Sequence, residues 1–129
     1  MTATKCKATF RLTGASRAAI SARHTSLVNA CLLWLKTRRI PAHKMNSGAA
    51  KTAHGSFIRY GFPGCPDIVG ILPGGKFLGV ECKTGAGRLT EHQESFRVVV
   101  ENSGGVFVLV RELDDLVREV GPFVGMGGR

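Results

Sequence analysis

Two apolar runs separated by a glycine turn constrain the fold of this chain more than any other feature. Residues 68–72 and 76–83 are rich in aliphatic side chains, and the turn between them reads Pro-Gly-Gly at 73–75. Apolar runs of this length on either side of such a turn are typical of a β-hairpin. The sequence therefore predicts two antiparallel strands in the middle of the chain.

Helical patterns surround this hairpin. Residues 21–38 carry an apolar stripe at helical spacing, and a second helix is expected over 90–102. The continuous apolar run at 106–110 predicts a buried parallel strand, joined to the hairpin by a right-handed helical crossover. A last short helix is expected over 113–120. The pattern as a whole predicts an α/β fold, in which helices pack against a mixed sheet.

The remaining segments are expected to lack regular structure for the most part. Residues 46–66 are dominated by turn residues and have one extended pattern at 57–60, so we expect a long connection with one strand. A connection of this length in a small domain is usually functional. We expect residues 1–20 to form a basic N-terminal arm and 121–129 a flexible tail, which leaves 21–120 as one domain.

Charge is distributed very unevenly along the chain. The 129 residues carry a net charge of +9, but residues 1–66 contain eleven Lys and Arg and no Asp or Glu. Residues 67–129 contain seven basic and nine acidic side chains. A half-chain this basic is expected to attract a polyanion, most simply the phosphate backbone of a nucleic acid. The alternative is a basic solvated surface without a specific partner.

Cysteine spacing and hydropathy indicate the compartment. The four cysteines, at positions 6, 31, 65 and 82, show no C-x-x-C spacing, which fits reduced thiols in the cytoplasm better than a disulfide framework or a zinc site. No apolar run reaches the roughly 18 residues that a membrane-spanning helix needs. We therefore predict a cytoplasmic protein with no membrane partner.

Asp67, Glu81 and Lys83 are the candidate catalytic residues. Asp67 is the first acidic residue of the chain and begins the hairpin, whereas Glu81 and Lys83 lie near its end. Because side chains alternate along a strand, Glu81 and Lys83 are expected on one face and Cys82 on the other. If the turn pairs Leu72 with Phe77, Asp67 lies opposite Cys82, or opposite Glu81 after a one-residue change of register.

Two carboxylates at the same end of neighbouring strands are suited to one hard divalent cation, with water completing its shell. Such a cation lowers the pKa of its bound water, and Lys83 could orient that water or stabilise charge on a phosphate. We therefore expect Mg²⁺ as the cofactor, with Mn²⁺ as a substitute. The alternative is an ordinary Glu–Lys pair on a surface hairpin.

These residues resemble those of a known family. The stretch Gly-Cys-Pro-Asp at 64–67, the hairpin, Gly-Val-Glu-Cys-Lys at 79–83 and the helix that contains Gln93 are similar to the PD-(D/E)XK nuclease superfamily. The segments Asn-Ser-Gly at 46–48, GFPGCPD and GRLTEHQ resemble its virus-type replication–repair nuclease (VRR-NUC) branch more narrowly. The resemblance covers roughly residues 22–111.

The resemblance implies a restriction-endonuclease-like fold with an α-β-β-β-α-β core and a metal-dependent endodeoxyribonuclease. Asp67 and Glu81 would be metal ligands, the backbone carbonyl of Cys82 a further ligand, Lys83 the catalytic lysine and Gln93 an accessory catalytic residue. Stand-alone relatives in phages and bacteria imply an intracellular homodimer that acts on branched DNA such as Holliday junctions. The alternatives are a nuclease for ordinary duplex DNA, a non-catalytic nucleic-acid-binding module, and a basic protein–protein adaptor.

Two positions have competing interpretations. Thr90-x-x-Gln93 is a capping box, which by itself explains a glutamine at 93, and one side chain is not expected to cap the helix and face the site. Relatives usually carry an acidic residue on the first helix, and the corresponding position here is near His24. His24 would ligate metal or bind phosphate, or it would be an exposed helix histidine. The missing carboxylate favours one metal ion over two.

The candidate nucleic-acid contacts lie in the loop and turns near the expected site. Each of them taken alone could equally be a solvated polar side chain. They are Lys44, Asn46, Ser47, Lys51, His54, Arg59 and Arg88.

Overall fold

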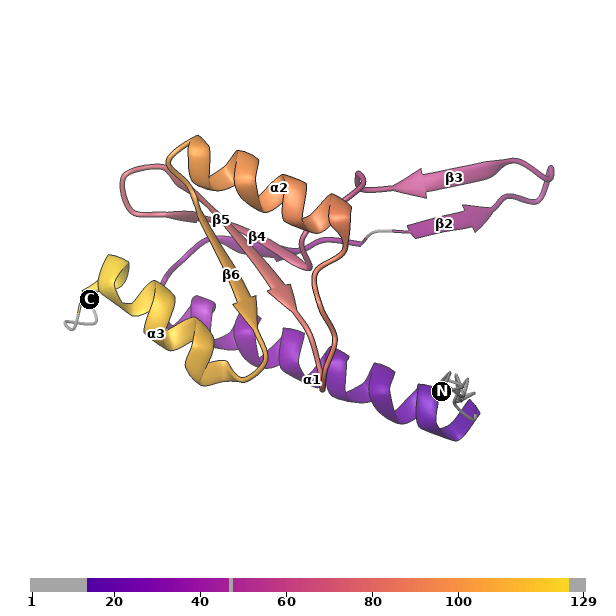
Figure 1. The fold of residues 1–129 in the computed structure, drawn as a ribbon, viewed down its shortest axis with the longest axis horizontal. Coiled ribbons are helices and arrows are strands. Elements are labelled where there is room, and N and C mark those ends of the chain that lie inside the picture. The colour runs from indigo at the N-terminus through magenta and orange to yellow at the C-terminus, as the bar shows by residue number, and fades with distance from the viewer. Residues whose placement is uncertain (1–13, 47, 126–129) are drawn as a thin grey trace, which may run out of the picture.

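The computed structural model describes residues 14–46 and 48–125 and has an α/β fold (Figure 1). A mixed sheet carries helices on both faces, so the predicted α/β class is confirmed. The elements follow one another as α1 (Gly14–Thr37), β1 (Ala42–Lys44), β2 (Gly48–Lys51), β3 (Phe57–Tyr60), β4 (Ile68–Leu72), β5 (Lys76–Cys82), α2 (Glu91–Asn102), β6 (Val106–Val110) and α3 (Leu113–Val124).

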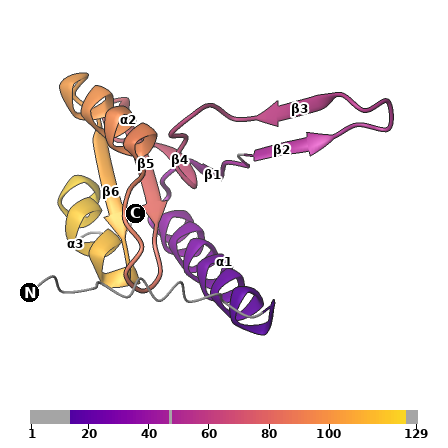
Figure 2. The same ribbon diagram turned by 45° about the vertical axis from the view of Figure 1, so that its right-hand side comes forward.

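The central sheet has four strands in the order β1-β4-β5-β6. Strands β4 and β5 form the predicted antiparallel hairpin, and β6 pairs in parallel with β5 after the α2 crossover, as expected. Helices α1 and α3 contact each other and lie on one face, whereas α2 covers the other face (Figures 1 and 2). Strand β1 completes the sheet beside β4.

The hydrophobic core lies between the sheet and the pair α1–α3. Buried side chains of α1 and α3 pack there against inward-facing residues of β4, β5 and β6. The α2 face is held by an aromatic cluster, in which the ring of Phe96 contacts those of Phe62 and Phe77 at centroid distances of 4.8 and 6.0 Å. Residues of β5 that face α2 therefore lie outside the main core, and this face carries Glu81.

The hairpin register follows the second of the two predicted alternatives. Leu72 pairs with Lys76, and Ile68 pairs with Val80, so Asp67 is placed opposite Glu81 rather than opposite Cys82. The three-residue turn needs left-handed backbone at both of its glycines, which have φ values of 84° and 78°. The shorter connection at the turn moves the pairing by one residue.

Both ends of the predicted domain extend further than the sequence indicates. Helix α1 begins at Gly14 rather than at residue 21, so residues 14–20 are helix and not part of an arm. These residues favour helix through alanine and arginine but carry no apolar stripe that would reveal it. Helix α3 continues to Val124, which places residues 121–124 of the predicted tail in the helix, and Val124 packs against the core. Residues 1–13 and 126–129 lie outside the described part of the chain.

The long connection predicted at 46–66 contains a second hairpin. Strands β2 and β3 pair with each other and form a separate two-stranded sheet that projects from the body of the molecule (Figure 1). The sequence predicts the strand at Phe57–Tyr60 but not its partner, because Gly-Ala-Ala-Lys has low strand propensity.

No helix in the described ranges 14–46 and 48–125 is both long and apolar enough to cross a membrane. Cys31, Cys65 and Cys82 are free and buried, which agrees with the prediction of reduced thiols. Cys6 lies outside the described residues.

Candidate active site

Asp67 is held at the start of β4 by contacts on both sides. Its backbone carbonyl accepts a hydrogen bond of 2.7 Å from the amide of Met45, which extends the pairing of β1 with β4. Gly64, three residues earlier, has a φ of 82°, and a Cβ at this position would clash with the carbonyl of His92 at the start of α2. The glycine therefore permits the close approach that brings the Asp67 loop against α2.

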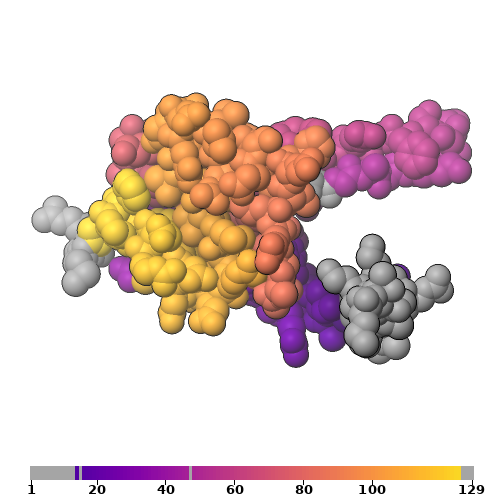
Figure 3. All heavy atoms as spheres, viewed as in Figure 1, coloured from indigo at the N-terminus to yellow at the C-terminus, as the bar shows by residue number. Residues whose placement is uncertain are grey.

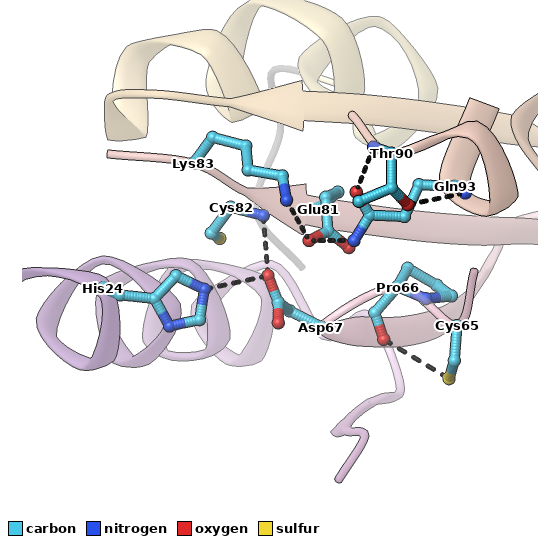
Figure 4. Close-up of polar contacts among 9 residues, drawn as sticks. All are labelled: His24, Cys65, Pro66, Asp67, Glu81, Cys82, Lys83, Thr90 and Gln93. Carbon is cyan, nitrogen blue, oxygen red and sulfur yellow. Dashed lines mark hydrogen bonds and ion pairs between the residues drawn. The ribbon is translucent and has the colours of Figure 1, made fainter. Parts of the chain in front are cut away.

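The Asp67 carboxylate accepts two hydrogen bonds through one oxygen. The amide of Cys82 donates to Oδ2 over 2.9 Å, and Nε2 of His24 lies 3.1 Å from the same oxygen (Figure 4). Because Cys82 follows Glu81 directly, the first of these bonds ties Asp67 to the strand that carries the second carboxylate. The side chain of Cys82 points into the core, on the opposite face from Glu81, as the strand alternation predicts.

Glu81 is the buried charged residue of the site, with a relative exposure of 3%. Its Oε1 accepts a hydrogen bond of 3.0 Å from Nε2 of Gln93 and lies 3.5 Å from Nζ of Lys83 (Figure 4). Its Oε2 is buried and has no hydrogen-bond partner in the described structure. An unpartnered oxygen on a buried carboxylate is costly, so this atom marks a place where a further partner would be stabilising.

The surroundings of Glu81 favour its neutral form. Burial and, second to it, the negative charge of Asp67 raise the pKa of the Glu81 carboxyl, and although the ammonium of Lys83 opposes both, the pKa reaches about 7. The two carboxyl groups are therefore close enough to compete for charge. Such competition is relieved when a cation lies between them.

Lys83 is on the same strand face as Glu81, as predicted. Its side chain is only one-fifth exposed and reaches the Glu81 carboxylate at the end of β5. A groove beside Lys83 runs along α1 and is lined by Arg17, Ser21, His24 and Gly87. Helix α1, which forms one side of this groove, carries no acidic side chain.

Gln93 performs both of the roles that we expected to exclude each other. Its side-chain Oε1 accepts a hydrogen bond of 2.9 Å from the backbone amide of Thr90. The backbone amide of Gln93 donates to Oγ1 of Thr90, and the two bonds together form the capping box of α2. Its Nε2 donates at the same time to Glu81. The expectation of a single role is wrong because the acceptor and the donor of one side-chain amide point in different directions (Figure 4).

His24 belongs to the site rather than to the solvated surface of α1. It is half-buried, and its ring nitrogen contacts the Asp67 carboxylate across 43 residues of sequence. A carboxylate accepts hydrogen bonds, so Nε2 is the donor and is occupied by Asp67. The contact gives His24 a direct role in orienting Asp67.

Arg17 lies beside the site but is not among the residues predicted from the sequence. Arg17, Ser21 and His24 follow one another at i, i+4 and i+7 on α1 and line the groove beside Lys83. This spacing would have placed them on one helix face, but residue 17 lies in the segment that we expected to be an arm.

The predicted nucleic-acid contacts do not gather in one place. Lys44 and Asn46 are exposed at and just beyond the end of β1, close in sequence to Met45 and its bond to Asp67. Arg88 is exposed in the connection between β5 and α2. The others lie on the projecting hairpin, with Lys51 on β2, Arg59 on β3 and His54 in the turn between them, while Ser47 lies outside the described residues.

The donor set fits a hard divalent cation with few protein ligands. Within the described ranges, no group of three or more His, Cys, Asp and Glu side chains is arranged to hold a metal ion. Mg²⁺ does not need such a group, since it is commonly held by one or two carboxylates and keeps several waters. Two adjacent carboxyl groups, one of them with a buried oxygen that lacks a partner, meet this requirement.

Comparison with known proteins adds no family assignment. No protein-family model matches this chain, and no curated protein matches it.

The two roles of Gln93 can be separated with a neighbouring residue. Gln93→Ala and Thr90→Ala each break the capping box, and each is expected to lower the free energy of unfolding by about 1 kcal/mol. Only Gln93→Ala also removes the donor to Glu81. If the site is catalytic, Gln93→Ala should lower the cleavage rate about tenfold or more, while Thr90→Ala leaves it within about twofold. Equal rates in two equally stable variants would contradict a role in the site.

Proposed function

We propose that this chain is a metal-dependent endonuclease that hydrolyses phosphodiester bonds in DNA. The observation that carries the proposal is the buried carboxylate of Glu81, which has an unpartnered oxygen and lies beside Asp67 and Lys83. Burying the Glu81 carboxyl beside a second, partly exposed carboxylate costs free energy, which a bound cation would offset. Strained electrostatics of this kind are typical of functional sites.

The fold order also supports a PD-(D/E)XK-type nuclease. Helix α1, strands β1, β4 and β5, helix α2 and strand β6 follow the α-β-β-β-α-β order expected of that superfamily, with β2 and β3 as an addition between β1 and β4. Asp67 precedes the second strand of this core, and Glu81 and Lys83 lie at the end of the third. This order of elements and candidate residues supports the proposal.

Asp67, Glu81 and the backbone carbonyl of Cys82 would hold the ion in this proposal, with Mg²⁺ as the natural cofactor and Mn²⁺ as a substitute. A bound divalent ion supplies Lewis acidity and lowers the pKa of a water. The side chains of the protein have separate tasks. Lys83 stabilises the negative charge that develops on the phosphate oxygens, Gln93 fixes the rotamer of Glu81, and His24 fixes that of Asp67.

The proposed substrate follows from charge and from the resemblance. The basic half of the chain supports a polyanionic substrate, because residues 1–66 contain eleven Lys and Arg and no Asp or Glu. The family resemblance extends the proposal to branched DNA such as a Holliday junction, cut by a homodimer in the cytoplasm of a bacterium or of a phage-infected cell. A catalytically silent DNA-binding module is the competing function.

Cleavage and binding assays on the same substrates test the proposal. Wild-type protein is expected to cut a labelled four-way junction with Mg²⁺ or Mn²⁺ and to leave it intact in EDTA. Asp67→Asn should abolish cleavage yet bind the junction at least as tightly as wild type, because it removes one negative charge next to the phosphates. A matched linear duplex in parallel reactions separates a branch-selective enzyme from a general one.

The outcomes of these assays separate the competing functions. Wild-type protein that binds both DNAs but cuts neither in the presence of either metal would replace the nuclease proposal with the silent binding module. Loss of binding in Asp67→Asn, with the fold intact by circular dichroism, would give Asp67 a role other than the one proposed.

A further inference from the structure

The β2–β3 hairpin stands clear of the rest of the protein. It projects from the body in both ribbon views, and the space-filling view shows it as a separate arm (Figures 1, 2 and 3). All eight of its strand residues are exposed, and Phe57 reaches a relative exposure of 73%. An isolated two-stranded hairpin is at best marginally stable in water, so an arm of this kind is typically completed by a partner.

The register of this hairpin sorts its side chains onto two faces. Lys51 pairs with Phe57 and Ala49 with Arg59, which places Phe57 next to both basic side chains on one face, across the hairpin from Lys51 and two residues before Arg59. The other face carries Ile58 and Tyr60 opposite small residues. His54 is exposed in the turn at the tip.

Charge decides which partner the arm fits. The hairpin contains Lys51 and Arg59 and no acidic residue, and α1 on the other side of the site is also without Asp or Glu. Two arms of the same sign repel each other, so a second copy of the hairpin is a poor partner for it. A polyanion is a good partner, because each phosphate contact releases counterions and the exposed apolar side chains can contact base edges in a groove.

We propose that the β2–β3 hairpin enters the major groove of double-stranded DNA and holds the duplex against the site. The major groove admits a two-stranded β-ribbon, whereas a single strand offers no groove to fill. The inference rests on the proposed function, since it assumes a DNA substrate. It adds that the part of this DNA next to the site is double-stranded. Lys51 and Arg59 contact phosphates on the two walls of the groove, and Phe57 lies next to both.

Paired variants of equal charge test this inference. Lys51→Gln with Arg59→Gln removes the two basic side chains of the arm, and Lys76→Gln with Arg97→Gln removes two at positions away from it. Binding is measured by fluorescence anisotropy in EDTA on a short duplex and on one of its strands. We expect the arm variant to lose tenfold or more in duplex affinity and the control at most about threefold. The slope of log K against log salt should fall by about two for the arm variant.

A chemically modified duplex tests the choice of groove. Glucosylated hydroxymethylcytosines fill the major groove without changing the phosphate backbone, and they should weaken binding of the wild type about tenfold but hardly affect the arm variant. An arm variant that binds duplex as well as the control would overturn the proposal. Equal sensitivity of both proteins to glucosylation would overturn the groove assignment.

Two further measurements keep this inference distinct from its rivals. Binding is measured without metal and therefore does not depend on cleavage. If the protein binds duplex through the hairpin but never cuts it, only the nuclease proposal is contradicted. If the wild type cuts DNA and the variant without Lys51 and Arg59 still binds duplex normally, only the present inference is contradicted. Light scattering on the wild type and on Ile58→Ser tests the alternative that the hairpin binds a second copy of the chain. A wild-type dimer that becomes a monomer in Ile58→Ser would make the hairpin a subunit interface and overturn the DNA assignment.

Discussion

Lys83→Ala is expected to lower the rate of DNA cleavage by about 100- to 1,000-fold in Mg²⁺. The ammonium lies 3.5 Å from the Glu81 carboxylate and the Lys83 side chain is only one-fifth exposed, so the charge is held in place before substrate binds. Removing one preoriented charge that stabilises the transition state typically has an effect of this size. Single-turnover cleavage of a labelled junction, with enzyme in excess, measures the chemical step directly.

Lys76→Ala is the matched control for this change. Lys76 begins the same strand and is exposed at the far end from Glu81, with its ammonium over the ring of Phe123. Its removal should leave the cleavage rate within about twofold, and both variants should bind junction DNA in EDTA within about tenfold of wild type. Equal cutting by wild type and Lys83→Ala would end the assignment of Lys83 as the catalytic lysine.

The stability of the metal-free protein is expected to fall as pH rises through neutrality. Burial and the nearby charge of Asp67 raise the pKa of the Glu81 carboxyl from an ordinary value of 4.5 to about 7. The folded state then binds this proton more tightly than the unfolded state, so the contribution is complete below pH 4.5 and is lost as pH rises through 7. The loss between these limits is roughly 3 kcal/mol, because one pKa unit corresponds to about 1.4 kcal/mol.

Glu81→Gln should remove this pH dependence, because an amide of the same shape carries no charge. In urea unfolding with EDTA, the variant is expected to be more stable than wild type by roughly 2–3 kcal/mol at pH 8 and nearly equal to it at pH 5. Mg²⁺ at pH 8 should stabilise the wild type and leave Glu81→Gln unchanged. Glu101→Gln, on the exposed side of α2, is the control and should follow the wild type at both pH values.

A wild type whose stability is flat between pH 5 and 8 would contradict the burial of an ionisable Glu81. If Mg²⁺ stabilises Glu81→Gln as much as the wild type, Glu81 is not a ligand of the cation.

The parts of this fold that the sequence predicts are those with a local signal. The β4–β5 hairpin, the capping box at Thr90 and the parallel strand at Val106–Val110 all depend on short patterns of apolar, glycine and capping residues, and the structure has each of them. The start of α1 and the end of α3 carry no such pattern. Strand β2 was missed because its Gly-Ala-Ala-Lys sequence is stabilised by pairing with β3 rather than by its own propensity.

The candidate site was predictable in composition but not in its connections. Strand alternation alone places Glu81 and Lys83 together, and the hairpin brings Asp67 near them. The contact of His24 with Asp67 depends on how α1 packs against the sheet, which no local pattern encodes. The same is true of the bond from Gln93 to Glu81, since it requires the crossing position of α2 over β5 as well as the cap.

The short bond from Met45 to Asp67 has a consequence for how such a protein can diversify. It joins the two ends of the segment between Met45 and Asp67, which carries the projecting hairpin, because β1 and β4 are neighbours in the sheet. This segment can therefore be shortened, lengthened or exchanged for that of another protein while its two ends stay in register. In the proposed nuclease, preference for a particular DNA shape would then change by exchange of this segment, while Asp67 stays as its anchor and Glu81 and Lys83 stay at the end of β5.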